Sequence, residues 1–137
     1  MKFLVSILVV AMMFITTSIT AQNKEIKVTV ANVSSDTGKV GFALYQKEGF
    51  MIKPVQSLES NIVNGKSVVV FKNVLPGEYS VVCFHDKNEN GKMDFSAQRM
   101  PLEDYGSSNN VMAFAPPTFE GSKFTLGKEN IELDIKF

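Results

Sequence analysis

Alternation of apolar and polar residues is the dominant pattern of the chain beyond its N-terminal segment. In residues 26–30, isoleucine or valine alternates with lysine or threonine, which is the period-2 pattern of a half-buried strand. Residues 38–46 show the same pattern and predict a second strand, and the apolar stretches 67–71 and 78–84, each of which follows a turn signal, predict two more. A last strand is expected over residues 130–137, where every second residue is apolar and the residues between are mostly charged.

Short turn signals separate these strands. Gly38 follows the sequence SSDT and can adopt the positive φ that closes a turn. Asn64–Gly65 is a preferred pair for a tight hairpin turn, and Pro76–Gly77 is a second turn signal. Period-2 strands with short connections predict an all-β fold, a single antiparallel β-sandwich or barrel.

Two segments depart from this pattern. Residues 49–61 (GFMIKPVQSLESN) suggest a helix, which Pro54 would limit to a turn or two. Residues 93–125 show no clear periodicity and contain Pro101, Pro116 and Pro117. A structureless stretch of this length in a small domain is often functional.

The N-terminal residues have the pattern of a secretory signal peptide. Lys2 precedes an apolar run over residues 3–15, which is shorter than the about 20 residues of a membrane-spanning helix. Cleavage after Ala21 would divide the chain into a signal peptide, residues 1–21, and one domain, residues 22–137. An uncleaved anchor is the alternative. We therefore expect an exported protein of the periplasm, cell surface or extracellular space, with no transmembrane segment after cleavage.

Composition narrows the function classes. Loss of Lys2 leaves 13 of the 14 basic residues against 14 acidic ones, a net charge of −1, and Arg99 is the sole arginine. This balance gives no electrostatic basis for nucleic-acid binding. Cys83 is the single cysteine, so no intrachain disulfide stabilises the exported domain.

The stretch FHDKNENGKMDF, residues 84–95, contains the most specific candidate chemistry. Counted from the first aspartate, side-chain oxygens occur at positions 1, 3, 5 and 9, a glycine at position 6 permits a sharp bend, and position 7 offers its backbone carbonyl. Hard oxygen donors at this spacing suit Ca²⁺. The predicted ligands are Asp86, Asn88, Asn90, Lys92 through its carbonyl, and Asp94.

The match to a helix-loop-helix calcium site is incomplete. Position 12 is Ala97 instead of the bidentate glutamate, and a strand precedes the loop, so we reject a true helix-loop-helix site. Water, Gln98, Glu103 or Asp104 would have to complete the coordination, and the expected affinity is weak, on the order of 10⁻⁴ to 10⁻³ M. The alternative is a polar hairpin turn centred on Asn90–Gly91.

Other candidate chemistry is limited. Cys83 and His85 lie two residues apart on a predicted strand and so share a face, as a catalytic thiolate–imidazole pair would require. No third residue obviously orients the imidazole, however. A buried structural cysteine is also far commoner than a catalytic one. We expect no enzymatic activity. In the proline-containing segment, Phe114, Phe119 and Phe124 either form an exposed binding surface or attach the segment to the core.

Three further stretches, residues 75–94, 100–110 and 115–124, together resemble the DUF2141 family of exported bacterial proteins of unknown function. The relevant sequences are LPGEYSVVCFHDKNENGKMD, MPLEDYGSSNN and APPTFEGSKF. The resemblance implies a transthyretin-like or Cna-B-like β-sandwich of about seven strands outside the cytoplasm, and it implies no catalytic residues. The sequence departs from the family pattern at Ser107, where relatives have an aromatic residue.

Taken together, these observations predict a non-enzymatic exported β-sandwich module of unknown physiological role, stabilised by a Ca²⁺-binding loop. The alternative is a carbohydrate- or peptide-binding module of the cell envelope that uses the surface of residues 100–124. In either case the partner is expected to be an envelope or extracellular molecule.

Overall fold

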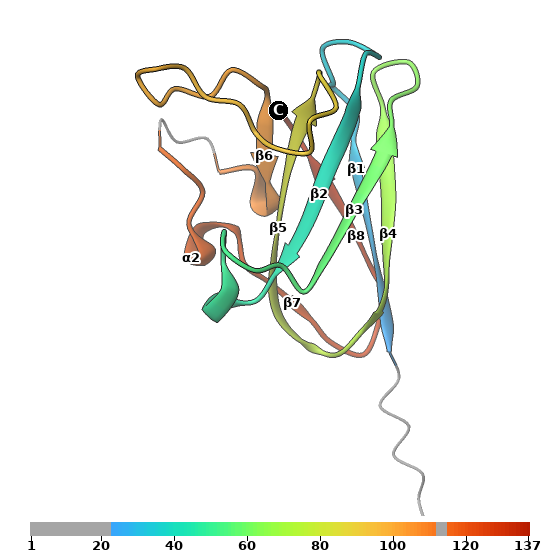
Figure 1. Cartoon of the computed structure of the whole chain (residues 1–137). Helices are drawn as coiled ribbons and strands as arrows, with labels where there is room; N and C mark the ends of the chain where they lie inside the picture. The colour runs from blue at the N-terminus through green and yellow to red at the C-terminus, as the bar shows by residue number, and fades with distance from the viewer. Residues whose placement is uncertain (1–22, 112–114) are drawn as a thin grey trace, which may run out of the picture.

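The computed structural model describes residues 23–111 and 115–137, which form a β-sandwich of two facing sheets (Figure 1). The predicted all-β sandwich is therefore confirmed. The predicted signal peptide, residues 1–21, lies outside the described residues. Among the described residues, no helix has the length and apolar character needed to span a membrane.

The larger sheet has the strand order β3-β2-β5-β6, with β7 paired to β5 as well. All of its pairs are antiparallel. Its strands are β2 (Lys39–Tyr45), β3 (Gln56–Asn61), β5 (Gly77–Asp86), β6 (Tyr105–Ser107) and β7 (Phe124–Leu126).

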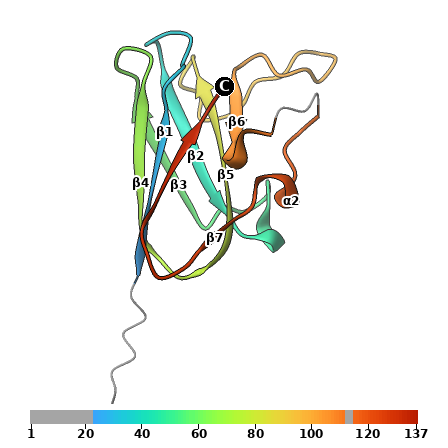
Figure 2. The ribbon, with the colours of Figure 1, turned by 180° about the vertical axis from the view of Figure 1, so that it is seen from behind.

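The smaller sheet has the order β4-β1-β8, with β1 in the centre. The strands are β1 (Lys24–Val30), β4 (Ser67–Val74) and β8 (Ile131–Ile135). β1 is antiparallel to β4 and parallel to β8, so the sandwich contains one parallel pair that period-2 patterning alone does not reveal. Figure 2 shows β8 running beside β1 on the back of the molecule.

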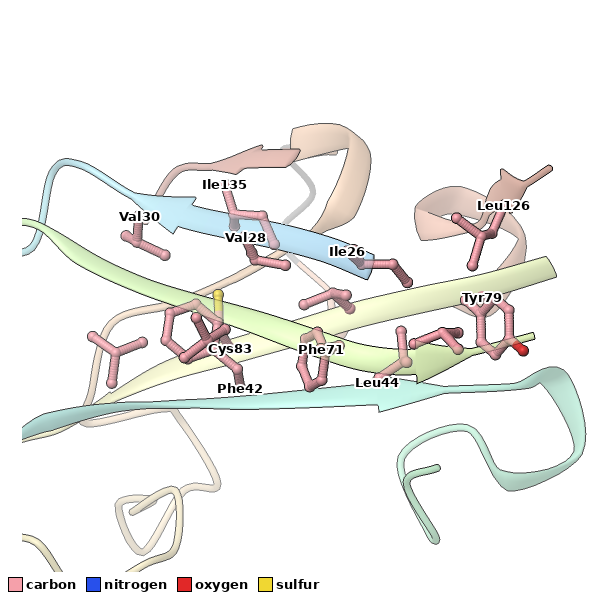
Figure 3. Packing of buried hydrophobic residues seen from close by; sticks show 14 of the residues in the cluster. Ile26, Val28, Val30, Phe42, Leu44, Phe71, Tyr79, Cys83, Leu126 and Ile135 are labelled. Carbon is pink, nitrogen blue, oxygen red and sulfur yellow. The ribbon is translucent and has the colours of Figure 1, made fainter. Parts of the chain in front are cut away.

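The core lies between the two sheets and is built from the residues that the alternation places on one face. Ile26, Val28 and Val30 of β1 are fully buried and face Phe42 and Leu44 of β2 (Figure 3). β4, β5, β7 and β8 supply most of the other members of the core cluster, which include Phe71, Tyr79, Val81, Cys83, Leu126 and Ile135. Burial of this apolar surface is the main favourable term for a chain without a disulfide.

The turns form as their residues predict. Gly38 has φ +80°, and Asn64 and Gly65 have φ +52° and +71°, the double positive φ of a type I′ hairpin turn. Asp36 accepts hydrogen bonds from the backbone N–H groups of Asn64 and Gly65, at 2.9 and 2.7 Å. This contact joins two turns that lie at the same end of the sandwich.

The helix suggested for residues 49–61 is wrong. A short 3₁₀ helix, η1 (Lys47–Gly49), comes earlier, and residues 56–61 form β3, which pairs along its length with β2. β3 has no buried residue, and its partly buried Leu58 packs on the core. Such a polar edge strand has a weak sequence signal, and its pairing is decided by the neighbouring strand.

The described parts of the segment 93–125, residues 93–111 and 115–125, contain more regular structure than the lack of periodicity predicts. They contain β6, a 3₁₀ turn η2 (Ser108–Asn110), the single-turn helix α2 (Phe119–Ser122) and most of β7. Side chains hold these pieces: Asn109 Nδ2 donates to the carbonyls of Gly121 and Lys123, and Asn110 bonds to β8 through the Asp134 carbonyl and the Lys136 N–H. Residues 107–110 (SSNN) therefore connect β5, α2 and β8 through side-chain hydrogen bonds, with Ser108 Oγ accepting from the Val81 N–H of β5.

We expect Phe42→Ala to lower the free energy of unfolding by about 3–5 kcal/mol, because a large aromatic side chain leaves a cavity between the sheets. Phe42 is 2% exposed, whereas Ile52 is 86% exposed. Ile52→Ala is the matched control and should change stability by less than about 0.5 kcal/mol. Urea unfolding followed by far-UV circular dichroism measures both, and equal effects of the two variants would contradict this description of the core.

Candidate metal centre

The predicted cation loop begins at the end of β5 and leaves the sheet at its last residue, Asp86. Gly38, in the turn before β2, packs so closely against this point that a Cβ there would collide with the Asp86 carbonyl oxygen. Asp86 is 4% exposed. The loop is thus supported at its first predicted ligand by the rigid part of the sandwich (Figure 1).

Asp94 is the point on which the asparagine side chains converge. Asn88 Nδ2 donates to Asp94 Oδ2 at 2.7 Å. Asn90 Nδ2 donates to both carboxylate oxygens of Asp94, at 2.9 and 3.1 Å. Three of the predicted ligands therefore lie on the inside of one bend, with their side chains directed toward one another.

Asp86 holds the other side of the bend. Its Oδ1 accepts from the Asn90 N–H at 3.1 Å, and its Oδ2 accepts from the Gly91 N–H at 2.8 Å. Asn90 Oδ1 accepts from the Lys92 N–H at 2.9 Å, and Asn88 Oδ1 accepts from the Asn90 N–H at 3.2 Å. The side-chain oxygens at alternate positions thus accept hydrogen bonds from the backbone of the loop, which folds around them.

A simple two-residue hairpin at Asn90–Gly91 is not what forms. A type I′ turn needs positive φ at both central residues, and here the positive values belong to Glu89 (φ +56°) and Gly91 (φ +76°). The next strand, β6, begins only at Tyr105. The loop is a wider bend than the plain turn that the sequence left open as an alternative.

Glu103 closes the bend, a role that the sequence did not show. Its Oε1 accepts from the Lys87 N–H at 3.1 Å and its Oε2 accepts from the Asp94 N–H at 3.0 Å, so one carboxylate joins the two ends of the loop. The side chain is buried, at 7% exposure. The sequence suggested Glu103 as a possible additional ligand, but no spacing rule connects it with a loop that ends at Asp94.

Asp104 and Gln98, the other suggested ligands, are not placed inside the bend. Asp104 Oδ2 accepts from Ser34 Oγ at 2.9 Å and lies 3.8 Å from Lys87 Nζ, while its carbonyl accepts from the His85 N–H. Gln98 is exposed in the segment beyond the loop. Asp104 ties the loop to the turn near residue 34.

The carboxylates of Asp86, Asp94 and Glu103 make no ion pair within the part of the chain that the structure describes. Nearby lysines pair elsewhere: Lys39 Nζ lies 3.8 Å from Glu89, and Lys87 pairs with Asp104. Their oxygens accept hydrogen bonds from neutral N–H groups, and two of the three side chains, Asp86 and Glu103, are buried. Buried negative charge without a counterion is costly, and a bound cation would relieve it.

The donor set is nevertheless modest. Across residues 23–111 and 115–137, no group of three or more His, Cys, Asp or Glu side chains is arranged to hold a metal ion. The predicted set offers carboxylate oxygens of Asp86 and Asp94, the Lys92 carbonyl, and amide oxygens of Asn88 and Asn90, which in this conformation accept backbone N–H groups. All are hard oxygen donors, which favours Ca²⁺ over zinc.

Cys83 and His85 are both fully buried on the core face of β5. Burial raises the pKa of the Cys83 thiol well above its ordinary value, and the thiol lies 3.7 Å from the Gly106 carbonyl oxygen, to which it donates. His85 Nε2 lies 2.7 Å from the Thr37 carbonyl, so the imidazole secures the end of the strand. Cys83 and His85 therefore have the burial and the hydrogen bonds of structural residues.

The aromatic residues of the proline-containing segment attach it to the sandwich. Phe119 is 7% exposed and stacks edge-to-face on Phe50, with ring centroids 5.8 Å apart. Phe124 packs on the core beside Tyr79. Phe114 lies outside the described residues. The structure therefore favours packing over an exposed aromatic surface for Phe119 and Phe124.

A groove of about 450 Å³ lies beside this segment, within the range of small-ligand sites. Its walls include Tyr105, Ser107, Pro116, Pro117, Thr118 and Phe137. The neighbouring polar side chains of Ser108, Asn109 and Asn110 are used in internal hydrogen bonds.

The fold and the loop define a class: a small β-sandwich module with a polar, carboxylate-lined loop at one end. The chain belongs to the family described as "Uncharacterized protein conserved in bacteria (DUF2141)", whose model matches residues 28–134. The predicted family is therefore confirmed. No curated protein matches the chain.

We expect Cys83 to resist alkylation by iodoacetamide in the folded protein and to react quickly in denaturant, because burial disfavours the nucleophilic thiolate. Mass spectrometry after timed quenching measures the modified fraction. Rapid modification of the native protein would contradict the buried position and would reopen a catalytic role for the thiol.

We expect Glu103→Gln to lower the free energy of unfolding by about 1–3 kcal/mol, because the new NH₂ group faces a backbone N–H and leaves a buried donor unpaired. Glu132→Gln is the matched control, since the Glu132 side chain is 78% exposed and pairs weakly with Lys27 at 3.6 Å. Urea unfolding in the presence of a chelator measures both variants. Equal, small effects would show that Glu103 does not close the loop.

Proposed function

We propose that this protein is a non-enzymatic, exported β-sandwich module whose Asp86–Asp94 loop binds Ca²⁺. The observation that supports the proposal most directly is the convergence of Asn88 and Asn90 on the Asp94 carboxylate, opposite a buried Asp86. Export rests on the signal-peptide pattern of residues 1–21. A non-enzymatic role is supported by the burial of the Cys83 thiol.

Cation binding would require a small rearrangement of this loop. The Nδ2 groups of Asn88 and Asn90 now face Asp94, so rotation of each amide plane would present an oxygen in their place. This rotation would give up the bonds that the two Oδ1 atoms accept from the Asn90 and Lys92 N–H groups. That loss is consistent with an affinity on the order of 10⁻⁴ to 10⁻³ M.

Such an affinity is useful outside the cytoplasm, where calcium is plentiful. With a Kd of about 0.1 mM and about 1 mM free calcium, binding adds roughly 1.4 kcal/mol to stability. The bound ion would join the end of β5 to the segment that leads toward β6 and would replace the cross-link that a disulfide supplies in other exported domains.

We expect calcium to raise the melting temperature by about 4–8 °C relative to buffer with a chelator. Asp94→Asn should abolish most of this shift, because it removes a carboxylate from the point of convergence. Glu132→Gln, a substitution of an exposed acid in β8, should keep the full shift. Differential scanning calorimetry measures the three proteins. Superimposable curves with and without calcium would refute the proposed site.

A carbohydrate- or peptide-binding role is the second candidate, supported by the groove of about 450 Å³ beside Tyr105 and the Pro116–Pro117 pair. Tyrosine and proline faces suit sugar rings and extended peptides. A glycan array and pull-down from envelope extract test this role. Tyr105→Ala should abolish capture while the unfolding curve stays cooperative; capture unaffected by this variant would exclude the groove.

A further inference from the structure

Residues 95–102 form a small hairpin between β5 and β6, here called the projecting hairpin. Phe95 and Pro101 face each other in an isolated antiparallel bridge. Figures 1 and 2, from opposite sides, show the segment between β5 and β6 extending away from both sheets. Residues 97–102 are all exposed, and the tip has the small and polar sequence SAQR, residues 96–99. An exposed tip of this composition is a preferred place for an endoprotease to cut a folded protein.

Few hydrogen bonds hold the tip of the projecting hairpin. The Ser96 N–H donates to the Met100 carbonyl at 2.8 Å, and the Met100 N–H donates to Ser96 Oγ at 3.2 Å. The Arg99 N–H donates to the Ser96 carbonyl at 2.9 Å. Met100 and Leu102 are already 64% and 61% exposed, so opening of the hairpin gives up little buried apolar surface. The tip can therefore open locally while the sandwich stays folded.

The backbone conformation of Arg99 also favours opening. Its φ of +61° lies in the left-handed region, where the Cβ of any residue other than glycine comes too close to the following carbonyl oxygen. A protease binds the residues around the bond that it cleaves as an extended strand. Extension of the tip in a protease cleft would thus relieve the strain at Arg99.

The side chain at the tip selects the class of protease. Arg99 is the sole arginine of the chain and the sole ionisable residue of the projecting hairpin. Trypsin-like endoproteases choose the residue before the cleaved bond by the charge of a specificity pocket, which is acidic and receives a long basic side chain. The residue after Arg99 is Met100, so the bond between them involves no proline.

The chain on both sides of the Arg99–Met100 bond is held to the sandwich by other contacts. The Glu103 carboxylate accepts from the N–H groups of Lys87 and Asp94, and so joins the segment after the hairpin to the loop before it. Farther along, β6 and β7 pair with β5, and β8 pairs with β1. Both sheets thus contain strands from each side of this bond.

We propose that the Arg99–Met100 bond is a processing site for a trypsin-like endoprotease and that the product is a sandwich of two chains. Water adds across this peptide bond, which leaves a carboxylate on Arg99 and an amino group on Met100. The first piece keeps β1 to β5 and the polar loop, and the second keeps β6 to β8. The paired strands hold the two pieces together. The proposal does not depend on cation binding by the loop.

Limited digestion of the mature chain with trypsin, in the presence of a chelator, tests this proposal. Trypsin also cleaves after lysine, so the lysines of the chain are internal competitors. One of them, Lys92, is exposed in the preceding loop, where its N–H donates to Asn90 Oδ1. Mass spectrometry should place the first cut at Arg99–Met100. A first cut after Lys92 or after any other lysine would overturn the proposal.

Substitutions separate the place of the cut from the type of residue. Arg99→Lys should keep the first cut at the same bond, whereas Arg99→Gln should remove it and prolong the life of the intact chain. The matched control is Lys128→Gln, since Lys128 is exposed in the connection between β7 and β8. This control should be cut like the unmodified chain. Equal persistence of the Arg99→Gln and Lys128→Gln variants would overturn the proposal.

The rate of cutting shows whether the tip opens locally. Phe42→Ala destabilises the core, so it should accelerate the first cut about a hundredfold if cutting requires global unfolding, and less than about twofold if the tip opens alone. Digestion in urea concentrations below the unfolding transition, corrected for trypsin activity on a small substrate, gives the same reading without a variant. A hundredfold acceleration, or a steep rise with urea, would overturn the proposal.

The state of the product is a separate measurement. After the first cut, the two pieces should elute together in size-exclusion chromatography at the volume of the intact chain and should separate only in denaturant. The far-UV circular dichroism spectrum should stay unchanged. Separate elution in native buffer, or loss of the β-sheet spectrum on cutting, would overturn the proposed two-chain product.

Discussion

The packing and pairing of β5 is the constraint on which the rest of the structure depends. One edge of β5 pairs with β2 from Tyr45↔Ser80 to Lys39↔Asp86, and the other edge pairs with β7 near the start and β6 near the end. Between β7 and β6, Ser108 Oγ takes the place of a strand by accepting from the Val81 N–H. β2, β6 and β7 thus pair directly with β5, and β3 joins the sheet through β2.

β5 also determines where the polar loop begins. Its inward face ends with buried Cys83 and His85, and the next residue, Asp86, turns out of the sheet with both carboxylate oxygens bonded to loop N–H groups. Glu103 then returns the chain to the loop ends before β6 pairs with β5. The end of β5 and a buried glutamate thus hold a bend that is rich in side-chain oxygens.

The same hydrogen bonds around Asp94 also hold the segment that follows the loop, residues 95–102. Because Glu103 and the Leu102 N–H both bind the Asp94 region, residues 95–102 project as a defined hairpin instead of collapsing on the sheet. On the other side of β6, Asn109 and Asn110 hold α2 and β8 in place. The described parts of the long segment between β5 and β7 therefore consist of short elements that polar side chains connect to one another and to β8.

Alternation in β1, β2 and β8 predicted these strands and the faces that turn inward, because one face of each strand must leave water. Asn64–Gly65 and Gly38 likewise determined their turns through positive φ. The spacing of Asp86, Asn88, Asn90 and Asp94 predicted a sharp polar bend, in which the Asn88 and Asn90 side chains meet at Asp94. Only the tertiary structure decided that polar residues 56–61 form β3, that β8 is parallel to β1, and that Glu103 closes the loop. These features depend on contacts between residues far apart in the chain, for which local pattern carries no signal.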